Sequence, residues 1–296
     1  MSATFTAYPD EASWLEARRS KITSSDLPVI LGLLDNVSPF GLWLEKTGQG
    51  EPRESSYLMR RGHGMEDFIA AEYARETGGV ELSDPGGYTV AAREWRGATV
   101  DRLIHRLPEG DEFMNEAEGI LEIKAPTPYG MHKYADGPDK YVVAQVQWQM
   151  HVTGLAVADV AVDLGTRLEV FRINANPALQ EALEREALRF REYVTTNTPP
   201  PPDGHPQTAQ ALAAFFAEPV EETVVFDAEG REWFDRRKAA INAVDQYAAE
   251  RAEAENWFRR ELGQATVGNA PDLSYQVTWR PDKNGTRRIA FKEIDA

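Results

Sequence analysis

The segment 119–126 places two charged residues inside an otherwise apolar strand. Its run Ile120-Leu121-Glu122-Ile123-Lys124 alternates with a period of two, which predicts a β-strand that ends before Pro126. Glu122 and Lys124 then lie on one face, and the apolar residues next to them lie on the other. Two charges buried without partners would cost several kcal/mol. We therefore expect partners for them, such as a metal ion and a water molecule.

A second strand-like segment, residues 98–104, has Asp101 in its middle, where aspartate is disfavoured. An acidic residue at such a position needs a specific partner. A hairpin-like pairing of the two strands, turning through residues 109–111, would bring Asp101 beside Glu122. The two strands together then predict a pair of neighbouring carboxylates with one lysine.

These residue types suit the hydrolysis of a phosphodiester. A divalent cation must be held by oxygen ligands while positions stay open for water and a phosphate oxygen. A nearby ammonium can orient or acidify the attacking water and stabilise the developing negative charge. Asp101, Glu122 and Lys124 meet that requirement, and Glu66, on a predicted helix over residues 61–76, could supply or orient a further ligand. The Glu-x-Lys pattern alone is weak, and a surface salt bridge on an edge strand is the alternative.

The rest of the pattern predicts an α/β fold that ends at a proline-rich segment. Helices are expected over residues 11–19, 39–47, 61–76, 141–152 and 178–194, and a hairpin over residues 158–173. The stiff run Pro199 to Pro202 is the clearest boundary in the chain. We expect a domain over residues 1–198, a linker over 199–206, and an extension of helices and a β-hairpin over 207–296.

Several local features follow from residue type and spacing. Residues 22–26 resemble a helix N-terminus, because Ser and Asp side chains cap free backbone N–H groups. The long helix expected near residues 231–262 is too apolar to be solitary, so we expect it to pack either on a partner subunit or on the core of the same chain. Core positions are expected at Met65, Phe68, Ile69, Tyr73, Trp148 and Phe190.

Composition excludes several classes of protein. There is no cysteine, which removes disulfides, zinc–thiolate sites and thiol nucleophiles. No run of 18 or more apolar residues predicts a membrane span, and the first ten residues show no secretory signal, so we expect a cytoplasmic protein without membrane contact. The net charge of −16 argues against a broad nonspecific DNA coat but allows a lined channel. P-loop, β-lactamase and zinc-hydrolase patterns are all incomplete in this sequence.

The order of several motifs resembles a known family, the YqaJ-type viral recombinase nucleases. These are relatives of phage lambda exonuclease within the PD-(D/E)XK superfamily, and the resemblance covers about residues 11 to 195. The motifs are Trp14-Leu15-Glu16-Ala17-Arg18-Arg19, Ile22-Thr23-Ser24-Ser25-Asp26, Leu31-Gly32, Ser38-Pro39, Leu42-Trp43, Glu45-Lys46-Thr47-Gly48, Gly62-His63-Gly64-Met65-Glu66, Asp101-Arg102-Leu103, Leu121-Glu122-Ile123-Lys124-Ala125-Pro126 and residues 141–150.

The resemblance implies a restriction-endonuclease-like core, with a mixed central sheet flanked by helices, and a role for each matching residue. Asp101 and Glu122 would be metal ligands, with the backbone carbonyl of Ile123 as a third and Glu66 acting directly or through water. Lys124 would position the water nucleophile, and Gln145 would support the site from the neighbouring helix. The 5′-terminal phosphate would be held by Arg18 and Ser25, which suits a guanidinium and a hydroxyl near a helix start.

The sequence departs from the family's usual pattern in two places. Thr99-Val100 precede Asp101 where Pro-Asp is common, and Arg102 replaces a glycine. His132 and Lys133 are the candidates for a further phosphate contact, which has no secure counterpart. Both departures leave the expected metal site intact, and both bear on how a DNA end is bound.

The function implied is a magnesium-dependent exonuclease of a phage or prophage, with Mn²⁺ able to substitute. It would digest one strand of linear double-stranded DNA in the 5′-to-3′ direction and leave a 3′ overhang. The implied partners are a single-strand annealing protein and further copies of the chain in a ring-shaped oligomer, such as a trimer. Two alternatives remain open: an end-independent endonuclease or repair nuclease, and a catalytically idle DNA-binding scaffold.

Overall fold

The computed structural model describes residues 3–50, 56–86, 89–106, 117–270 and 275–293. The chain divides into two compact units, Met1–Pro219 and Val220–Ala296, and each is described by itself. The turn expected at residues 109–111 lies outside the described residues. No helix in the described part of the chain combines the length and the apolar character needed to cross a membrane.

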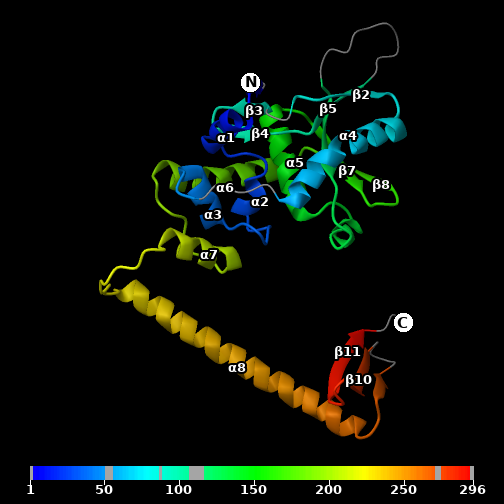
Figure 1. The fold of residues 1–296 in the computed structure, drawn as a ribbon, viewed down its shortest axis with the longest axis vertical. Coiled ribbons are helices and arrows are strands. Elements are labelled where there is room, and N and C mark those ends of the chain that lie inside the picture. Colours follow the sequence, from blue (N-terminus) through cyan, green and yellow to red (C-terminus); the bar gives the residue numbers. More distant parts are fainter. Residues whose placement is uncertain (1–2, 51–55, 87–88, 107–116, 271–274, 294–296) are drawn as a thin grey trace. The chain divides into compact units, whose positions relative to one another are not determined.

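The first unit is built on a mixed five-stranded sheet in the order β2-β5-β6-β7-β8. The central pair β6 and β7 is parallel, and every other neighbouring pair is antiparallel. This confirms the expected α/β core with a mixed central sheet (Figure 1). The strands are β2 (Val80–Ser83), β5 (Arg102–Arg106), β6 (Gly119–Lys124), β7 (Val157–Asp163) and β8 (Leu168–Asn174).

Helices cover the two faces of this sheet. On one face, α4 (Tyr57–Thr77) packs against Leu121 and Ile123 of β6. On the other, α5 (Lys140–Thr153) packs against Ile120. Because side chains alternate along a strand, Glu122 and Lys124 face α5.

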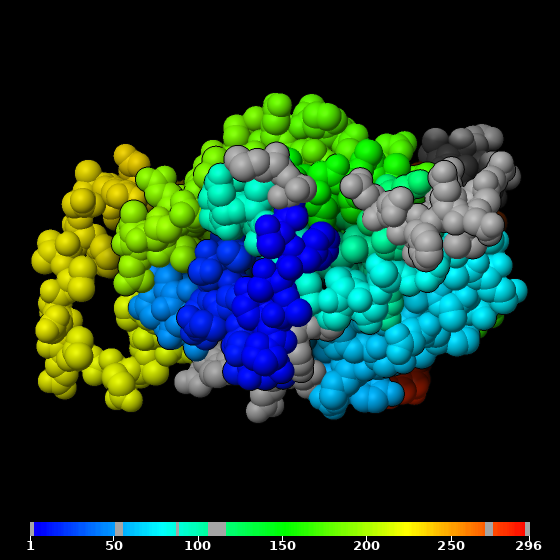
Figure 2. Space-filling view, turned by 90° about the horizontal axis from the view of Figure 1, so that it is seen from above, coloured from blue at the N-terminus to red at the C-terminus, as the bar shows by residue number. Residues whose placement is uncertain are grey.

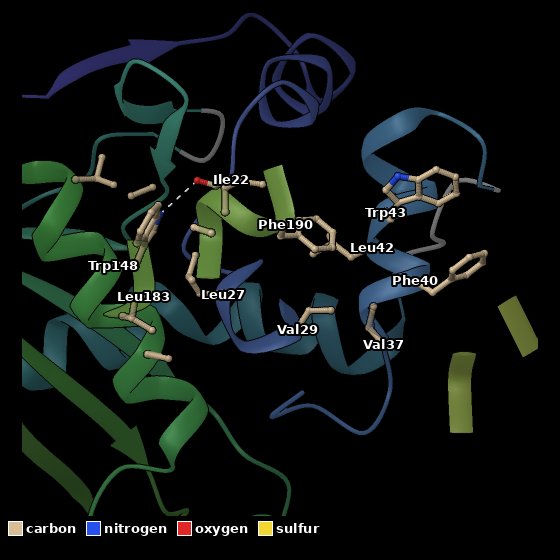
Figure 3. Packing of buried hydrophobic residues seen from close by; sticks show 14 of the residues in the cluster. Ile22, Leu27, Val29, Val37, Phe40, Leu42, Trp43, Trp148, Leu183 and Phe190 are labelled. Carbon is tan, nitrogen blue, oxygen red and sulfur yellow. Dashed lines mark hydrogen bonds between the residues drawn. The ribbon is translucent and has the colours of Figure 1, made fainter. Parts of the chain in front are cut away.

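A second layer of helices encloses another core, shown in Figure 3. Trp148 of α5 lies fully buried there, and its indole N–H donates to the carbonyls of Ile22 and Gly97 at 3.3 and 3.0 Å. The expected burial of Trp148 and Phe190 is confirmed. The helices are α1 (Glu11–Arg19), α2 (Leu27–Ile30), α3 (Pro39–Thr47), α6 (Pro177–Thr195) and α7 (Pro206–Phe215).

A small antiparallel sheet holds the N-terminal segment against this core. Its order is β1 (Thr4–Ala7), β3 (Thr89–Arg93) and β4 (Arg96–Ala98). Ile22 forms a bridge to Arg96, and Figure 2 shows the dark-blue N-terminal residues against the turquoise surface near β3 and β4. A side-chain carbon at Gly97 would come within 3.3 Å of Lys21 and Thr23, so glycine permits this close approach.

Two local expectations were wrong. Phe68 is 58% exposed, because α4 rests on the sheet through Ile69, Ala70 and Tyr73. Asp26 precedes α2 but makes no side-chain cap there. Its carboxylate instead accepts the backbone N–H of Thr23 at 2.6 Å and pairs with Lys46.

The end of the first unit falls later than the proline-rich segment. The ring of Phe215 in α7 lies 6.1 Å from the rings of both Phe40 and Trp43. His205 Nε2 also lies 2.7 Å from the carbonyl oxygen of Leu34. Helix α7 therefore packs with the core, although the sequence assigns it to the extension. The division into functional domains at residues 199–206 stays a prediction.

The second unit contains one long helix and a three-stranded antiparallel sheet. Helix α8 (Ala228–Leu262) has no buried residue, and the sheet has the order β11-β10-β9. The hairpin expected at the C-terminus is present as β10 (Tyr275–Pro281) and β11 (Arg287–Glu293). The sequence pattern missed β9 (Val267–Ala270), which pairs with β10.

A buried ion pair ties α3 to the loop after α1. Lys46 Nζ lies 2.6 Å from Asp26 Oδ2, and the two side chains are only 3% and 6% exposed. The same ammonium donates to the carbonyls of Arg18 and Lys21 at 3.0 and 2.9 Å. All three of its hydrogens therefore have acceptors, at the end of α1 and in the following loop that carries Ser25.

Lys46→Ala should lower the free energy of unfolding by about 3–5 kcal/mol, because it leaves the Asp26 carboxylate buried without its cation. Arg189→Ala is the matched control, since it removes one partner of an exposed pair with Glu186 and should cost less than about 1 kcal/mol. Denaturant unfolding of the full chain measures both. Equal losses in the two variants would contradict the assigned role of Lys46.

Candidate active site

The antiparallel register of β5 and β6 sets the two expected carboxylates side by side. Arg102 pairs with Leu121, so the preceding residue, Asp101, comes opposite Glu122. Asp101 lies immediately before β5 rather than in the middle of a strand. Its Oδ2 atom accepts the backbone N–H of Ile123 at 2.7 Å. The neighbourhood predicted from the two strand patterns is therefore present, although strand β5 begins later than expected.

Glu122 is 2% exposed, and hydrogen bonds reach both of its carboxylate oxygens. Oε1 accepts from Lys124 Nζ at 2.5 Å and from Gln145 Nε2 at 2.7 Å. Oε2 accepts from Gln149 Nε2 at 2.7 Å. Lys124 Nζ also donates to Gln145 Oε1 at 3.1 Å, which closes a ring of three side chains. The structure thus brings together Glu122, Lys124 and Gln145, as the sequence suggested.

The charges of this cluster act strongly on one another. Burial, followed by the negative charge of Glu122, raises the pKa of Asp101 well above its ordinary value, and Lys124 offsets only part of that rise. Burial would lower the pKa of Lys124, but the carboxylates of Glu122 and Asp101 outweigh it and raise that pKa. Lys124 therefore stays an ammonium at neutral pH. The two carboxyl groups of Asp101 and Glu122 have one ammonium, Lys124, between them, and this excess of acidic groups favours the binding of a further cation.

The donor chemistry fits a hard divalent cation. Within the described residues, no three His, Asp or Glu side chains gather into a complete metal-binding group. Mg²⁺ does not require one, because it is commonly held by one or two carboxylates and keeps several waters. Asp101 and Glu122 supply such a pair of oxygen donors. The carbonyl of Ile123 as third ligand stays a prediction.

Glu66 lies apart from the hydrogen-bonded ring. Its carboxylate lies 2.8 Å from His63 Nδ1 on the same helix, an ordinary (i, i+3) pair. Its negative charge nevertheless contributes to the raised pKa of Asp101. The structure therefore places Glu66 close enough to act on the site electrostatically, while its role as a ligand is untested.

Arg18 and Ser25 meet at a second polar group. Arg18 Nη2 donates to Ser25 Oγ at 2.6 Å, and the guanidinium lies over the ring of Trp14 at 4.4 Å. Next to Ser25, the hydroxyl of Ser24 lies 3.5 Å from the carbonyl oxygen of Thr99. Gln149 donates to that same oxygen at 2.8 Å, so a short path of contacts joins this group to the carboxylates.

Gln149 is the residue that sequence reasoning missed. It is fully buried, and it links Glu122 to the backbone just before Asp101. The available signal was its spacing, because a residue four positions after Gln145 shares the same face of a helix. Gln147, between them, points elsewhere and donates to the carbonyl of Asn174 at 2.8 Å.

A cavity of about 270 Å³ opens beside Lys124 and is lined also by Lys133, Tyr134 and Tyr141. Lys133, a candidate for phosphate contact, therefore borders the same space as the catalytic lysine candidate. The imidazole of His132 contacts the backbone three residues earlier, with Nδ1 lying 2.7 Å from the carbonyl oxygen of Tyr129. Of the two candidates, the geometry favours Lys133.

Comparison with known proteins bears out the resemblance noted in the sequence. Residues 13–156 match the model of the YqaJ-like viral recombinase domain, and this span includes every candidate site residue named above. The chain is 28% identical to the protein YqaJ of Bacillus subtilis (strain 168) over 276 residues, which cover 90% of this chain and 82% of that protein.

Solved structures show a similar fold. LHK-Exo in complex with dAMP matches with a TM-score of 0.51 and 24% identity, over 63% of this chain and 94% of that chain. A second structure of LHK-Exo, an alkaline exonuclease from Laribacter hongkongensis, has 21% identity and a TM-score of 0.49, over 69% and 98% of the two chains. The first match supports the shared fold of the core.

Asp101→Asn should stabilise the metal-free protein at alkaline pH. The pKa of the Asp101 carboxyl is higher in the folded state than in the unfolded state. Its contribution to the free energy of unfolding is therefore fully present below the unfolded-state pKa and is lost as the pH rises through the folded-state pKa. A neutral amide avoids that loss. We expect a rise in Tm of about 2–4 °C at pH ~8, equivalent to ~1 kcal/mol, which disappears towards pH ~4.

Thermal unfolding in chelator across that pH range measures the effect. Glu181→Gln, which neutralises an exposed carboxylate on α6, is the control and should leave Tm almost unchanged. A lower Tm for Asp101→Asn at alkaline pH would show that the two carboxylates do not repel each other as described.

Proposed function

We propose that the protein is a magnesium-dependent DNA exonuclease that degrades one strand of linear duplex DNA from its 5′ end. The observation that carries the proposal is the buried cluster of Asp101, Glu122, Lys124 and Gln145 within a YqaJ-like domain. Two carboxylates and an ammonium, on β6 and at the start of β5, cost folding free energy if they have no catalytic use. Their retention argues against an idle scaffold.

The residues divide the work of hydrolysis. A bound divalent cation would supply Lewis-acid stabilisation of the phosphate and a reactive water. Asp101 and Glu122 would hold it, with the Ile123 carbonyl and Glu66 completing its surroundings. Lys124, kept protonated by its neighbours, is suited to donate a hydrogen bond to the attacking water or to a phosphate oxygen, and is unsuited to accept a proton. Gln145 holds Lys124 and Glu122 in register.

Recognition of a 5′ end would fall to Arg18 and Ser25. A guanidinium next to a hydroxyl offers charge-assisted hydrogen bonds to a terminal phosphate. The related fold of LHK-Exo binds dAMP, a deoxynucleotide, which is consistent with a nucleotide-binding site on this core. A 3′ overhang produced in this way would serve a single-strand annealing protein, and a ring of several copies, such as a trimer, would hold the duplex during successive cleavages.

The test uses linear duplex DNA with and without 5′-phosphates, covalently closed circular DNA, and Mg²⁺, Mn²⁺ or chelator. We expect metal-dependent loss of linear DNA only, faster with a 5′-phosphate. Lys124→Ala should lower kcat by about 100-fold or more. Arg18→Ala should lower kcat/KM about 10-fold on 5′-phosphorylated ends and little on 5′-hydroxyl ends, whereas Arg19→Ala, the neighbouring control, should change neither. Cleavage of circular DNA would favour an endonuclease, and no cleavage with any metal would favour the scaffold.

Gln149→Leu should lower kcat about 10- to 100-fold with little change in KM, because Glu122 loses the partner that fixes one of its oxygens. Gln147→Leu is the matched control, since that glutamine is equally buried on α5 and bonds to Asn174 and Asn176 instead. Both substitutions should cost about 1–3 kcal/mol of stability. Equal activity per folded molecule in the two variants would remove Gln149 from the site.

A further inference from the structure

The three strands of the C-terminal sheet have one packed face and one open face. Phe291 lies 5.2 Å from Phe258 of α8, and Val277, its cross-strand partner, is buried. Figure 1 shows the sheet at the C-terminal end of α8. Because side chains alternate along each strand, the neighbouring positions point away from α8. This outer face consists of Val267 and Asn269 on β9, Gln276, Thr278 and Arg280 on β10, and Arg288, Ala290 and Lys292 on β11.

The outer face carries three cations and no carboxylate among these residues. Arg280 and Arg288 are directly opposed across the strands, an arrangement that costs free energy between like charges. Arg288 is paired with Asp282 at 2.8 Å. In the part of the chain that the structure describes, neither Arg280 nor Lys292 has an ion-pair partner, and both are exposed. This cluster does not stabilise the sheet.

The positive charge of residues 275–293 is opposite in sign to the net charge of the whole chain. The net charge is −16, yet residues 275–293 contain five Lys or Arg and two Asp or Glu. Polar groups share this face, the hydroxyl of Thr278 and the amides of Gln276 and Asn269, and Gln276 Nε2 donates to Asn269 Oδ1 at 3.0 Å. A surface with three cations and no carboxylate suits a ligand that carries negative charge and hydrogen-bond acceptors along its length.

We propose that the outer face of the C-terminal sheet binds the phosphate backbone of DNA, as a second contact distinct from the carboxylate cluster. The proposal rests on the proposed function for its choice of a nucleic acid over an acidic protein. Arg288 and Lys292 are four residues apart, or roughly 13 Å along a strand. That separation reaches different phosphates of one DNA strand, whose nucleotides rise about 3.4 Å each.

The test measures binding of fluorescein-labelled duplex DNA to the full chain in chelator, by anisotropy at several salt concentrations. The double variant Arg280→Ala with Lys292→Ala should weaken binding at least about 3-fold and reduce the slope of log affinity against log salt by about 2. Arg288 is left in place because it pairs with Asp282. The matched control, Arg237→Ala with Lys238→Ala, removes the same charge from exposed positions on α8 and should keep the parent slope.

The same preparations separate this proposal from the proposed function. If the outer-face variant loses the salt slope while the parent cleaves no DNA, the second contact stands and the exonuclease proposal fails. If the parent cleaves DNA and the outer-face variant binds as the parent does, the second contact is overturned and an acidic protein becomes the expected ligand. Equal losses in the two double variants, or no measurable binding by the parent, would also overturn it. At saturating DNA, the outer-face variant should keep the parent kcat.

Discussion

The carboxylate of Glu122 is buried, and three side chains, Lys124, Gln145 and Gln149, donate to it. An ionised group at such a depth persists only with partners of this kind. The strand register adds Asp101 on one side, and α5 must cover the same face to deliver both glutamines. The strand register and the position of α5 thus bring these groups to Glu122, and burial together with the charge of Glu122 raises the pKa of Asp101.

The candidate site was predictable where the signal lies within one strand or one helix. Alternation in residues 119–124 gave Glu122 and Lys124 a common face, and Asp101 stood out as an acid in an apolar run. Asp26 could not be assigned in this way, because a carboxylate at a helix start either caps locally or pairs with a distant cation. Here the carboxylate forms an ion pair with Lys46, twenty positions later in the sequence. Gln149 depended similarly on knowing which face of α5 meets the sheet.

The fold was predictable to a similar extent. Long periodic helices such as α3 and α6 were found almost to the residue, because their apolar faces recur over two or more turns. The short strands β4 and β9 have too few residues to show a period. Helix α7 was separated from the core by four prolines in sequence, yet Phe215 fills a space beside Phe40 and Trp43. A stiff segment therefore marks a change of chain direction and need not end a packed unit.

Helix α8 has a consequence for the lifetime of the protein in a cell. None of its 35 residues is buried, so its backbone is protected by its own hydrogen bonds and little else. Local opening of such a segment costs little free energy, and proteases cut where the chain opens. A single cut there would break the chain between the first unit, Met1–Pro219, and the C-terminal sheet. Proteolysis would thus yield a shorter chain that keeps the carboxylate cluster and has lost its covalent link to the outer face.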